Sequence, residues 1–296
     1  MRILVIIIIV CSLPFLSKSQ GCSDAGLCTI AGLDSSYGEG GTQTSAKFST
    51  IFGLGEQNVF HITTQFEIII PTFKNQLVQI KMPYNFTFGN LGNISGLGDL
   101  SLSINQKVYS IKDVRINFVA GFKIPSGDAN KTKDGFPLPM AYQPSLGTYD
   151  IILGISTNYQ SWHMSFGYQH SFGHNLNEFE HRYDNLANFN DYNESYHLPR
   201  ADDIMLRVEK AFNINSYKLL FGVLPIYHLW EDKIKDGQKV AGSSGLTLNL
   251  NAAAEKKFKN DMLMNIILAA PIIDREVRPD GLTRSFVVVV SFSKAL

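Results

Sequence analysis

The sequence predicts an all-β fold: a closed, antiparallel, up-and-down transmembrane β-barrel of about twelve strands, with ten to fourteen compatible with the pattern. Three observations predict it. Twelve stretches of about ten residues alternate apolar and polar side chains, as strands with two different faces do. The connections between them alternate in length, and aromatic residues bracket the apolar faces. An even number of strands allows closure, which leaves no unpaired strand edge in lipid.

Residues 1–20 form the first element and read as a secretory signal peptide. Arg2 provides a basic start, residues 3–16 are apolar, and small or polar residues follow as far as Gln20. Ser12 and Pro14 interrupt the apolar run, which is shorter than the roughly 20 residues that cross a bilayer as a helix. We therefore expect export, and no helical membrane span in the rest of the chain.

Residues 21–43 form a short N-terminal segment, which we expect in the periplasm or in the lumen of the barrel. It contains Cys22 and Cys28, the two cysteines that remain once Cys11 leaves with the signal peptide. Outside the cytoplasm such a pair predicts a disulfide that closes a small loop. Two alternatives stay open. Cys22 could carry a lipid anchor, although no aliphatic residue stands three positions before it, and the pair could bind a metal together with Asp24.

Residues 44–296 form the predicted barrel. The candidate strands lie near 44–54, 60–70, 76–84, 98–108, 114–124, 148–158, 161–173, 201–212, 216–229, 244–255, 261–270 and 284–294. Short connections are expected at 71–75, 109–113, 159–160, 213–215 and 256–260, and long polar ones at 85–97, 125–147, 174–200, 230–243 and 271–283. Short turns at one end and long loops at the other are typical of outer-membrane barrels, with both termini at the periplasmic, short-turn end.

The stretch from Thr148 to Phe172 indicates which face of the strands meets lipid. One face of each strand is apolar and the other is polar, so alternation alone would also fit a soluble barrel. Tyr149 and Tyr159 stand at opposite ends of the first apolar face, as interfacial aromatic girdles require. The predicted lipid-facing side chains are Tyr149, Ile151, Leu153, Ile155, Trp162, Met164, Phe166, Tyr168 and Phe172. Phe292, close to the C-terminus, is the kind of aromatic residue that the barrel-assembly machinery is thought to recognise.

The same parity places charged residues of both signs on the face toward the lumen. An arginine left in lipid near the midplane would cost about 2–4 kcal/mol, which favours the inward orientation. They could pair with one another and fill a narrow barrel, or they could line a solute path, and the sequence leaves both open. The lumen-lining candidates are Glu67, Lys81, Asp99, Arg115, Lys123, Arg207, Glu209 and Lys218.

Several classes of function find no support in the sequence. The formal net charge is zero, so no basic footprint for nucleic acid exists. The histidines are spread between the wall and a polar loop, which does not predict a metal site, and we expect no cofactor. His170 and Ser171 are adjacent and therefore point to opposite faces of a strand, so they cannot act as the pair that a barrel lipase needs. We expect no enzyme.

Three stretches resemble one known family. They are "GLGDLSLSI" at 96–104, "FPLPMAYQPSLGTYDIILGIS" at 136–156 and "RPDGLTRSFVVVVSFS" at 278–293. Together they resemble the outer-membrane transporters of the MetA-pathway phenol-degradation family, relatives of the fatty-acid and aromatic-hydrocarbon transport barrels. The matching elements are Gly98-Asp99, Gly147 with Asp150, and residues 280–284. Hydrocarbon-transporting relatives often carry a large N-terminal hatch, whereas only about 20 residues lie between Cys22 and the first strand here.

The resemblance implies an outer-membrane channel or transporter for small or hydrophobic solutes, aromatic compounds among them. Its expected partners are outer-membrane lipid, the barrel-assembly machinery and the solute itself. The alternative is a barrel without transport, in which the long external loops serve adhesion or envelope structure. An open lumen would favour the first function, and a lumen sealed by side chains the second.

Overall fold

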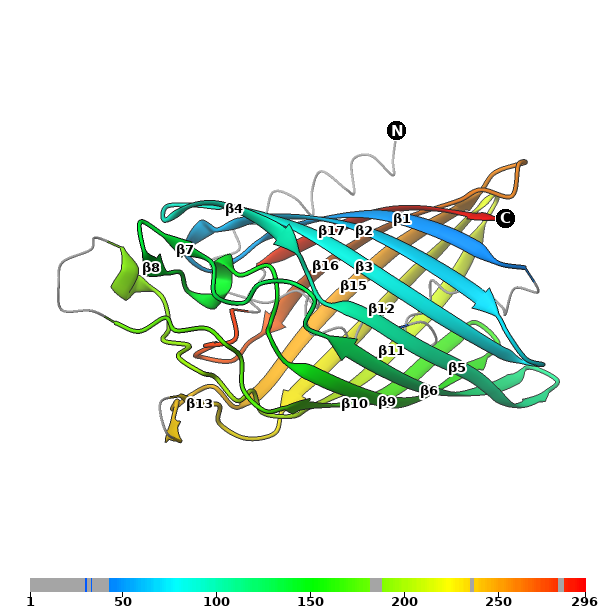
Figure 1. Cartoon of the computed structure of the whole chain (residues 1–296). Coiled ribbons are helices and arrows are strands. Elements are labelled where there is room, and N and C mark those ends of the chain that lie inside the picture. Colours follow the sequence, from blue (N-terminus) through cyan, green and yellow to red (C-terminus); the bar gives the residue numbers. More distant parts are fainter. Residues whose placement is uncertain (1–29, 31–32, 34–42, 182–187, 235–236, 282–284) are drawn as a thin grey trace.

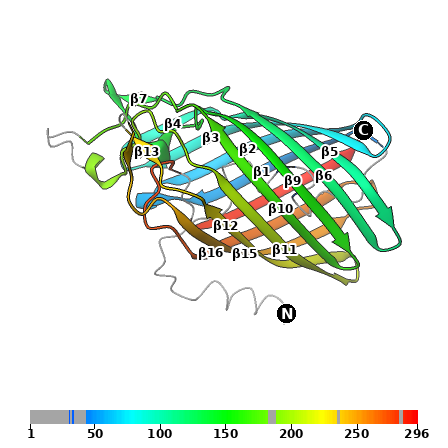
Figure 2. The same cartoon turned by 90° about the horizontal axis from the view of Figure 1, so that it is seen from below.

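The structure is a computed structural model, and it describes residues 30, 33, 43–181, 188–234, 237–281 and 285–296. Twelve antiparallel strands form a closed barrel, and one extra strand lengthens its wall (Figures 1 and 2). The twelve are β1 Ser45–Leu54, β2 Phe60–Pro71, β3 Gln76–Gly89, β5 Leu100–Ile111, β6 Val114–Ile124, β9 Tyr149–Tyr159, β10 Trp162–Phe172, β11 Asp203–Ile214, β12 Tyr217–His228, β15 Gly245–Lys257, β16 Leu263–Ile273 and β17 Phe286–Ala295.

The barrel closes because its first and last strands pair along their whole length. Ser45 of β1 lies opposite Ala295 of β17, and Leu54 lies opposite Phe286. Each of the other strands pairs with its neighbours along the chain, so every strand of the ring has two partners. This satisfies the backbone donors and acceptors that lipid could not. The prediction of about twelve strands is confirmed, with strand ends that differ by a few residues.

One predicted connection is wrong. Residues 85–97, expected as a long polar loop, continue β3 to Gly89 and then return as β4 Gly92–Leu97. β4 pairs with the C-terminal half of β3, and β5 pairs with its N-terminal half. β4 and β5 therefore follow each other along the same side of β3. The asparagines and glycines of this stretch suggested a loop, but its alternation continues through Phe86 and Phe88.

The connections differ in length at the two ends of the barrel as predicted. Five short turns, at 72–75, 112–113, 160–161, 215–216 and 258–262, lie at the end where β1 begins and β17 finishes. The opposite end carries the loops 125–148, 173–202, 229–244 and 274–285, which gather to the left of the barrel in Figure 1. These loops contain small pieces only: β7 Thr132–Lys133, β8 Phe136–Pro137, β13 Lys233–Ile234, β14 Gln238–Lys239, η3 Met140–Tyr142 and η4 Phe189–Asp191. A further turn, η2 Glu56–Asn58, connects β1 to β2.

The wall has an apolar outside and a largely polar inside. On β10, Trp162, Met164, Phe166 and Phe172 expose between 36% and 49% of their surface, whereas His163, Ser165 and Ser171 expose 7% or less. Tyr149 and Tyr159 are both exposed, at opposite ends of β9. The predicted orientation of these faces is therefore confirmed. Among the described residues, no helix is long and apolar enough to cross a membrane.

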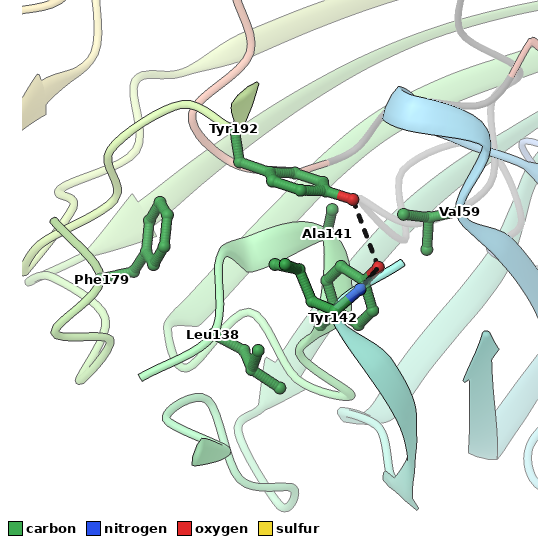
Figure 3. Close-up of a cluster of buried hydrophobic side chains, with 7 residues drawn as sticks. Val59, Leu138, Ala141, Tyr142, Phe179 and Tyr192 are labelled. Atoms are coloured by element: carbon green, nitrogen blue, oxygen red, sulfur yellow. Dashed lines mark hydrogen bonds between the residues drawn. The ribbon is translucent and has the colours of Figure 1, made fainter. Parts of the chain in front are cut away.

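A buried, mainly apolar region stabilises the loop end. This region, which we call the loop cluster, consists of Val59, Leu91, Leu138, Ala141, Tyr142, Phe179 and Tyr192 (Figure 3). It joins η2, the β3–β4 turn and the loops 125–148 and 173–202. The Tyr142 hydroxyl accepts a hydrogen bond from the Leu91 amide at 3.0 Å, and it lies 3.2 Å from the Tyr192 hydroxyl. Gly89 permits this approach, because a Cβ there would lie 2.1 Å from the Tyr142 hydroxyl.

Candidate functional site

The interior of the barrel is the candidate site, and it collects most of the charged residues that the sequence placed there. Glu67, Lys81, Lys123, Arg207 and Glu209 are buried on the inner face of their strands. Asp99 lies between β4 and β5 rather than inside a strand, but its side chain is also largely buried. Arg115 and Lys218 stand near the short-turn end and are partly exposed. The structure thus brings some of the eight together and keeps others apart.

Glu67 is the centre of a polar group on β1, β2 and β3. Its carboxylate accepts hydrogen bonds from Gln65 at 2.6 Å and Gln79 at 2.7 Å, and it lies 3.6 Å from the ammonium of Lys47. In the strand register, Lys47, Glu67 and Lys81 stand directly opposite one another on three adjacent strands. Opposite charges on neighbouring strands attract, which stabilises this register.

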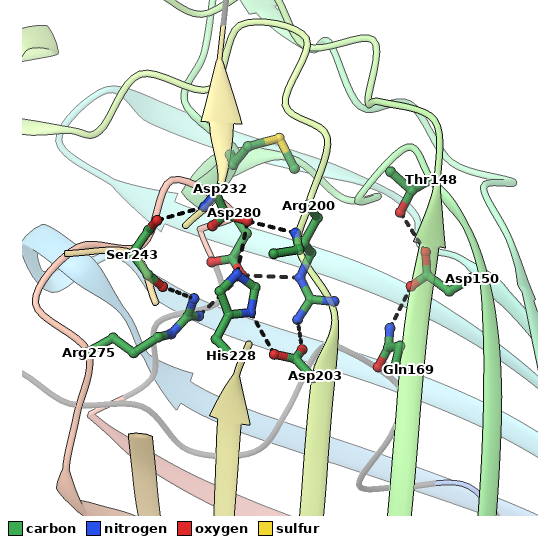
Figure 4. Close-up of polar contacts among 12 residues, drawn as sticks. Thr148, Asp150, Gln169, Arg200, Asp203, His228, Asp232, Ser243, Arg275 and Asp280 are labelled. Atoms are coloured by element: carbon green, nitrogen blue, oxygen red, sulfur yellow. Dashed lines mark hydrogen bonds and ion pairs between the residues drawn. The ribbon is translucent and has the colours of Figure 1, made fainter. Parts of the chain in front are cut away.

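Lys123 of β6 is held between two carboxylates. Its ammonium lies 2.7 Å from Asp150 of β9 and 3.4 Å from Asp99. Asp150 also accepts hydrogen bonds from Thr148 at 2.7 Å and Gln169 at 2.6 Å (Figure 4). With a cation and two further donors around it, Asp150 has its charge well compensated. This group therefore ties β6, β9 and β10 together across the inner wall.

The remaining charges form looser pairs. Arg207 and Glu209 stand two residues apart on the inner face of β11, with 3.5 Å between their charged atoms. Lys218 of β12 pairs with Glu255 of β15 at 3.2 Å, and its side chain is 37% exposed. Arg115 stands opposite Asn158 at the same end of the barrel. Of these residues, Arg115 and Lys218 are partly exposed near the short-turn mouth, whereas Arg207 and Glu209 are buried.

An apolar cluster interrupts the polar inner wall. Val119, Ile152, Met205 and Leu224, from β6, β9, β11 and β12, pack together with Ile226 beside them. Ile30 and Leu33 lie against them, and both are almost completely buried. The Leu33 carbonyl accepts a hydrogen bond from Ser165 at 2.9 Å. Part of the segment predicted as periplasmic or lumenal therefore lies inside the lumen, while Cys22 and Cys28 fall outside the described residues.

Two inward glycines seat these N-terminal side chains. A Cβ at Gly121 would lie 2.6 Å from Cδ1 of Ile30, and a Cβ at Gly154 would lie 2.7 Å from Cδ2 of Leu33. Both distances are too short for real atoms, so a larger residue at either position would push the ends of these two side chains away. The wall is thus shaped to accept two aliphatic side chains at this height of the barrel.

A further charged group lies at the loop end, and we call it the loop-end clamp. Its members are Arg200, Asp203, His228, Asp232, Ser243, Arg275 and Asp280 (Figure 4). Arg200 pairs with Asp203 and, at 3.2 Å, with Asp280. Arg275 lies 3.3 Å from the same Asp280 oxygen. The clamp joins the ends of β11 and β12 to three of the long loops.

His228 is central to the clamp. Its Nδ1 lies 2.6 Å from Asp203, and its Nε2 lies 2.9 Å from Asp232. Carboxylate oxygens only accept hydrogen bonds, so both contacts are satisfied together only by the imidazolium, which has a proton on each nitrogen. With His228 charged, the clamp holds three cations and three carboxylates.

The family-like motifs have structural roles at this end of the barrel. Gly147 and Gly281 have positive φ angles of 74° and 68°, which favour glycine. A Cβ at Gly281 would lie 2.5 Å from the Ala141 nitrogen. Asp150 and Asp280, from the second and third motifs, each hold a buried cation, Lys123 and Arg200 respectively. Residues 282–284 of the third motif fall outside the described residues.

Of the histidines that the sequence raised, His163 and His170 lie on opposite faces of the wall, whereas the rings of His174 and His197 stack with their centres 5.0 Å apart. His163 faces the lumen, where it lies 2.9 Å from Asn158, whereas His170 faces outward and contacts Asp202 at 2.7 Å. Ser171 is buried on the inner face, so His170 and Ser171 do point to opposite sides of the wall. No group of three or more metal-binding side chains occurs in the part of the chain that the structure describes.

Sequence reasoning missed the clamp and the apolar cluster. The apolar cluster had a detectable signal, because Val119, Ile152 and Met205 are apolar residues at positions whose parity is inward. The clamp had no sequence signal of comparable strength. Arg200 and Asp280 are 80 residues apart, and they lie at the edges of loops, where no periodicity applies.

The fold and the orientation of its faces define a closed transmembrane β-barrel. The chain is similar to the COG4313 outer membrane channel from Pseudomonas putida F1, with 12% sequence identity, coverage of 89% of this chain and 99% of that chain, and a TM-score of 0.64. Weaker similarity is found to the NanC porin (9% identity, coverage of 86% and 100%, TM-score 0.48) and to the CymD monoaromatic hydrocarbon channel (8% identity, coverage of 95% and 95%, TM-score 0.46). No protein-family model matches the sequence, and no curated protein is significantly similar to it. What this chain shares with the Pseudomonas channel is the fold.

Proposed function

We propose that this protein is an outer-membrane channel for small hydrophobic solutes, aromatic compounds among them, as the family resemblance implies. The observation that carries the proposal is the apolar cluster in the lumen. The cluster packs against Ile30 and Leu33, and a lumen that takes these aliphatic side chains can take an apolar solute in their place, since apolar surface beside water is unfavourable by about 25 cal/mol per Å². Val119, Ile152, Met205 and Leu224 are 1% exposed or less beside Ile30 and Leu33, so they offer an apolar solute a surface when these two side chains give way.

The proposal places the long loops outside the cell and the short turns in the periplasm, with the signal peptide removed. The structural likeness to an outer membrane channel supports this placement through the shared fold. Glu67, Lys81, Asp99 and Lys123 then form the compensated polar side of the lumen. Arg115 and Lys218 lie toward the periplasmic mouth, where they would act on ions and polar groups that pass, while Arg207 and Glu209 are buried on β11.

A polar substitution in the apolar cluster tests the proposal. Leu224→Asn replaces an aliphatic side chain by a carboxamide of nearly equal size. We expect uptake of a small aromatic hydrocarbon by Gram-negative cells carrying the channel to fall about tenfold, because the solute loses about 1.4 kcal/mol of favourable contact in the lumen. Leu220→Asn is the matched control, since Leu220 is buried on the same face of β12 but lies outside the cluster.

The outcome separates transport from the adhesive or structural alternative. An assembled Leu224→Asn barrel with unchanged hydrocarbon uptake, or an equal loss in both variants, would contradict a hydrophobic path through the cluster. A wild-type barrel that conducts no ions in planar bilayers and takes up no hydrocarbon would favour the alternative. Heat-modifiable mobility on detergent gels shows in each case that the closed barrel has formed.

A further inference from the structure

The outer rim at the short-turn end carries two lysines that lie on aromatic rings. The Lys210 ammonium is 5.0 Å from the centre of the Trp162 ring and 5.4 Å from that of Phe212. The Lys256 ammonium is 4.9 Å from the Tyr217 ring and 5.3 Å from the Phe258 ring. Such contacts attract a cation to the electron-rich ring face. We call these six residues the rim patch.

The members of the rim patch come from four neighbouring strands. Trp162 of β10 stands opposite Lys210 of β11, and Tyr217 of β12 stands opposite Lys256 of β15. In the barrel these strands follow one another in the order β10, β11, β12, β15. The positions share the outward parity of the lipid-facing residues, so the patch consists of two lysine–aromatic groups on the outer wall, offset by four residues in the register, near the turns of these strands.

The charge of this rim is positive. Lys257 at the end of β15 and Lys259 in the turn after it add to this charge, and the carboxylate of that turn, Asp261, pairs with Lys257 at 2.9 Å. Lys256 donates one hydrogen bond, to the Tyr217 hydroxyl at 3.1 Å. No carboxylate of the described residues forms an ion pair with Lys210 or Lys256, so at least two of the three donors on each ammonium face outward.

The opposite rim lacks this arrangement. There the outward aromatic side chains contact one another, as Phe60 does Phe88 at 6.5 Å and Phe122 does Tyr149 at 6.1 Å. Among the described residues, all the lysine–ring contacts lie in the rim patch. Aromatic girdles mark the depth of the lipid headgroups at both ends of a barrel. Within the described parts of the chain, the short-turn girdle is the one where lysines lie on the rings at that depth.

We propose that the rim patch is a binding site for the headgroup of an anionic phospholipid in the leaflet at the short-turn end. The rings hold the lysine stems against the wall and keep the ammonium groups at the depth where phosphodiesters lie. The indole N–H of Trp162 and the Tyr217 hydroxyl can each supply a further hydrogen bond to a phosphate beside the lysine of its own pair. A zwitterionic headgroup carries its own cation and gains less from the lysines, so the site selects net negative charge.

The two tryptophans of the mature chain allow a direct test. Trp162 belongs to the rim patch and is 39% exposed, and Trp230 lies beyond β12 at the loop end and is 53% exposed. In the Trp230→Phe barrel, reconstituted in phosphatidylcholine, we measure quenching of Trp162 by a small, equal fraction of dibrominated phosphatidylglycerol or dibrominated phosphatidylcholine. We expect the anionic lipid to be enriched about fivefold at Trp162, the factor that one lysine near a membrane surface provides. Raising the ionic strength should reduce the preference because salt screens exposed charges.

Matched variants locate the site. Lys210→Gln together with Lys256→Gln should bring the two quenching efficiencies close to equality. Lys74→Gln together with Lys112→Gln removes the same charge from two other turns of this rim and should leave the preference intact. In the Trp162→Phe barrel, Trp230 should show none. All variants are first checked for heat-modifiable mobility.

Equal quenching of Trp162 by both lipids would overturn the proposal, and so would a preference that survives in the Lys210/Lys256 variant. A loss of the same size in the Lys74/Lys112 control would show a diffuse charge effect and would also overturn a defined site. None of these measurements depends on solute passage, so the lipid site can fail while the proposed channel function holds.

Discussion

The two ends of the lumen use the same residue types in different surroundings. In the loop-end clamp, the side chains of Arg200, Asp203 and Asp280 are 4% exposed or less, and each meets its partners without access to water. At the short-turn end, Lys218 pairs with Glu255 while 37% of the lysine side chain stays exposed. Ion pairs inside a barrel therefore differ in their access to water, and this access decides what they do. Dry pairs hold loops in place, and wet pairs remain available to ions and solutes.

The physical basis is desolvation. Removing a charge from water is unfavourable, and a buried pair recovers this only when both partners are present with good geometry. Burial alone would lower the pKa of the Arg200 guanidinium, but the carboxylates of Asp203 and Asp280 raise it above its ordinary value. Arg200 therefore stays charged at every accessible pH. Its removal should destabilise the barrel more than the loss of any charge at the short-turn end.

We expect Arg200→Met to lower the free energy of unfolding by about 3–5 kcal/mol, because Asp203 and Asp280 each lose a buried cation. Urea titration of the heat-modifiable barrel measures this. Lys131→Met is the control, since Lys131 and Asp128 form an exposed pair in loop 125–148. An effect of equal size in both variants would show that the clamp is as wet as the surface, and the contrast between the two ends would disappear.

The loop cluster gives a smaller and pH-dependent effect. Burial, followed by the hydrogen bond with Tyr142, raises the pKa of the Tyr192 phenol above its ordinary value of about 10. A tyrosine in an opened loop ionises near that pH, while the one in the cluster keeps its proton. The stabilisation by Tyr192 is thus fully present below about pH 10 and is lost as the pH rises above it.

Protease cleavage within loop 173–202 reports this opening. We expect cleavage to accelerate above about pH 10, and Tyr192→Phe to remove much of that pH dependence. At neutral pH the same variant should destabilise the closed loop by about 1 kcal/mol, the ordinary contribution of one hydrogen bond. Phe179→Leu, which changes packing but not ionisation, serves as the comparison. A pH profile that is identical in the wild type and the Tyr192→Phe variant would contradict the role of the phenol.

The sequence predicted the barrel wall well because the wall is built from local periodicity. Alternation fixes which side chains share a face, so the outward Trp162 and the inward Lys123 could both be assigned without coordinates. The prediction failed at residues 85–97, because the composition of this stretch was given more weight than its alternation. It also passed over Val119 and Ile152, whose inward parity was visible but whose contact with Ile30 depends on how the strands curve around the lumen.

The clamp could not be predicted, because its geometry is fixed only after the barrel has closed. Asp203 and His228 are recognisable as polar residues at strand ends, but nothing local indicates that Asp232 and Asp280 would approach them. Nor could the predicted lumenal charges be sorted into dry and wet pairs from their spacing. Lys123 and Lys218 look alike in the sequence, and only the carboxylates around each, together with its access to water, distinguish them.

Lys218→Gln tests the wet end and should have the smallest effect on stability. A partly exposed ion pair contributes about 0–1 kcal/mol, so the free energy of unfolding should change by no more than that. The charge of the mouth changes by one unit, however, and Glu255 remains on the wall without Lys218. Fixed negative charge in a pore attracts cations, so the reversal potential across a salt gradient should shift toward cation selectivity. Lys74→Gln removes the same charge from the exposed turn at 72–75 and should leave the reversal potential nearly unchanged. If Lys218→Gln instead destabilised the barrel as strongly as Arg200→Met and left selectivity untouched, the short-turn pair would be as dry as the clamp. The ion path would then have to avoid it.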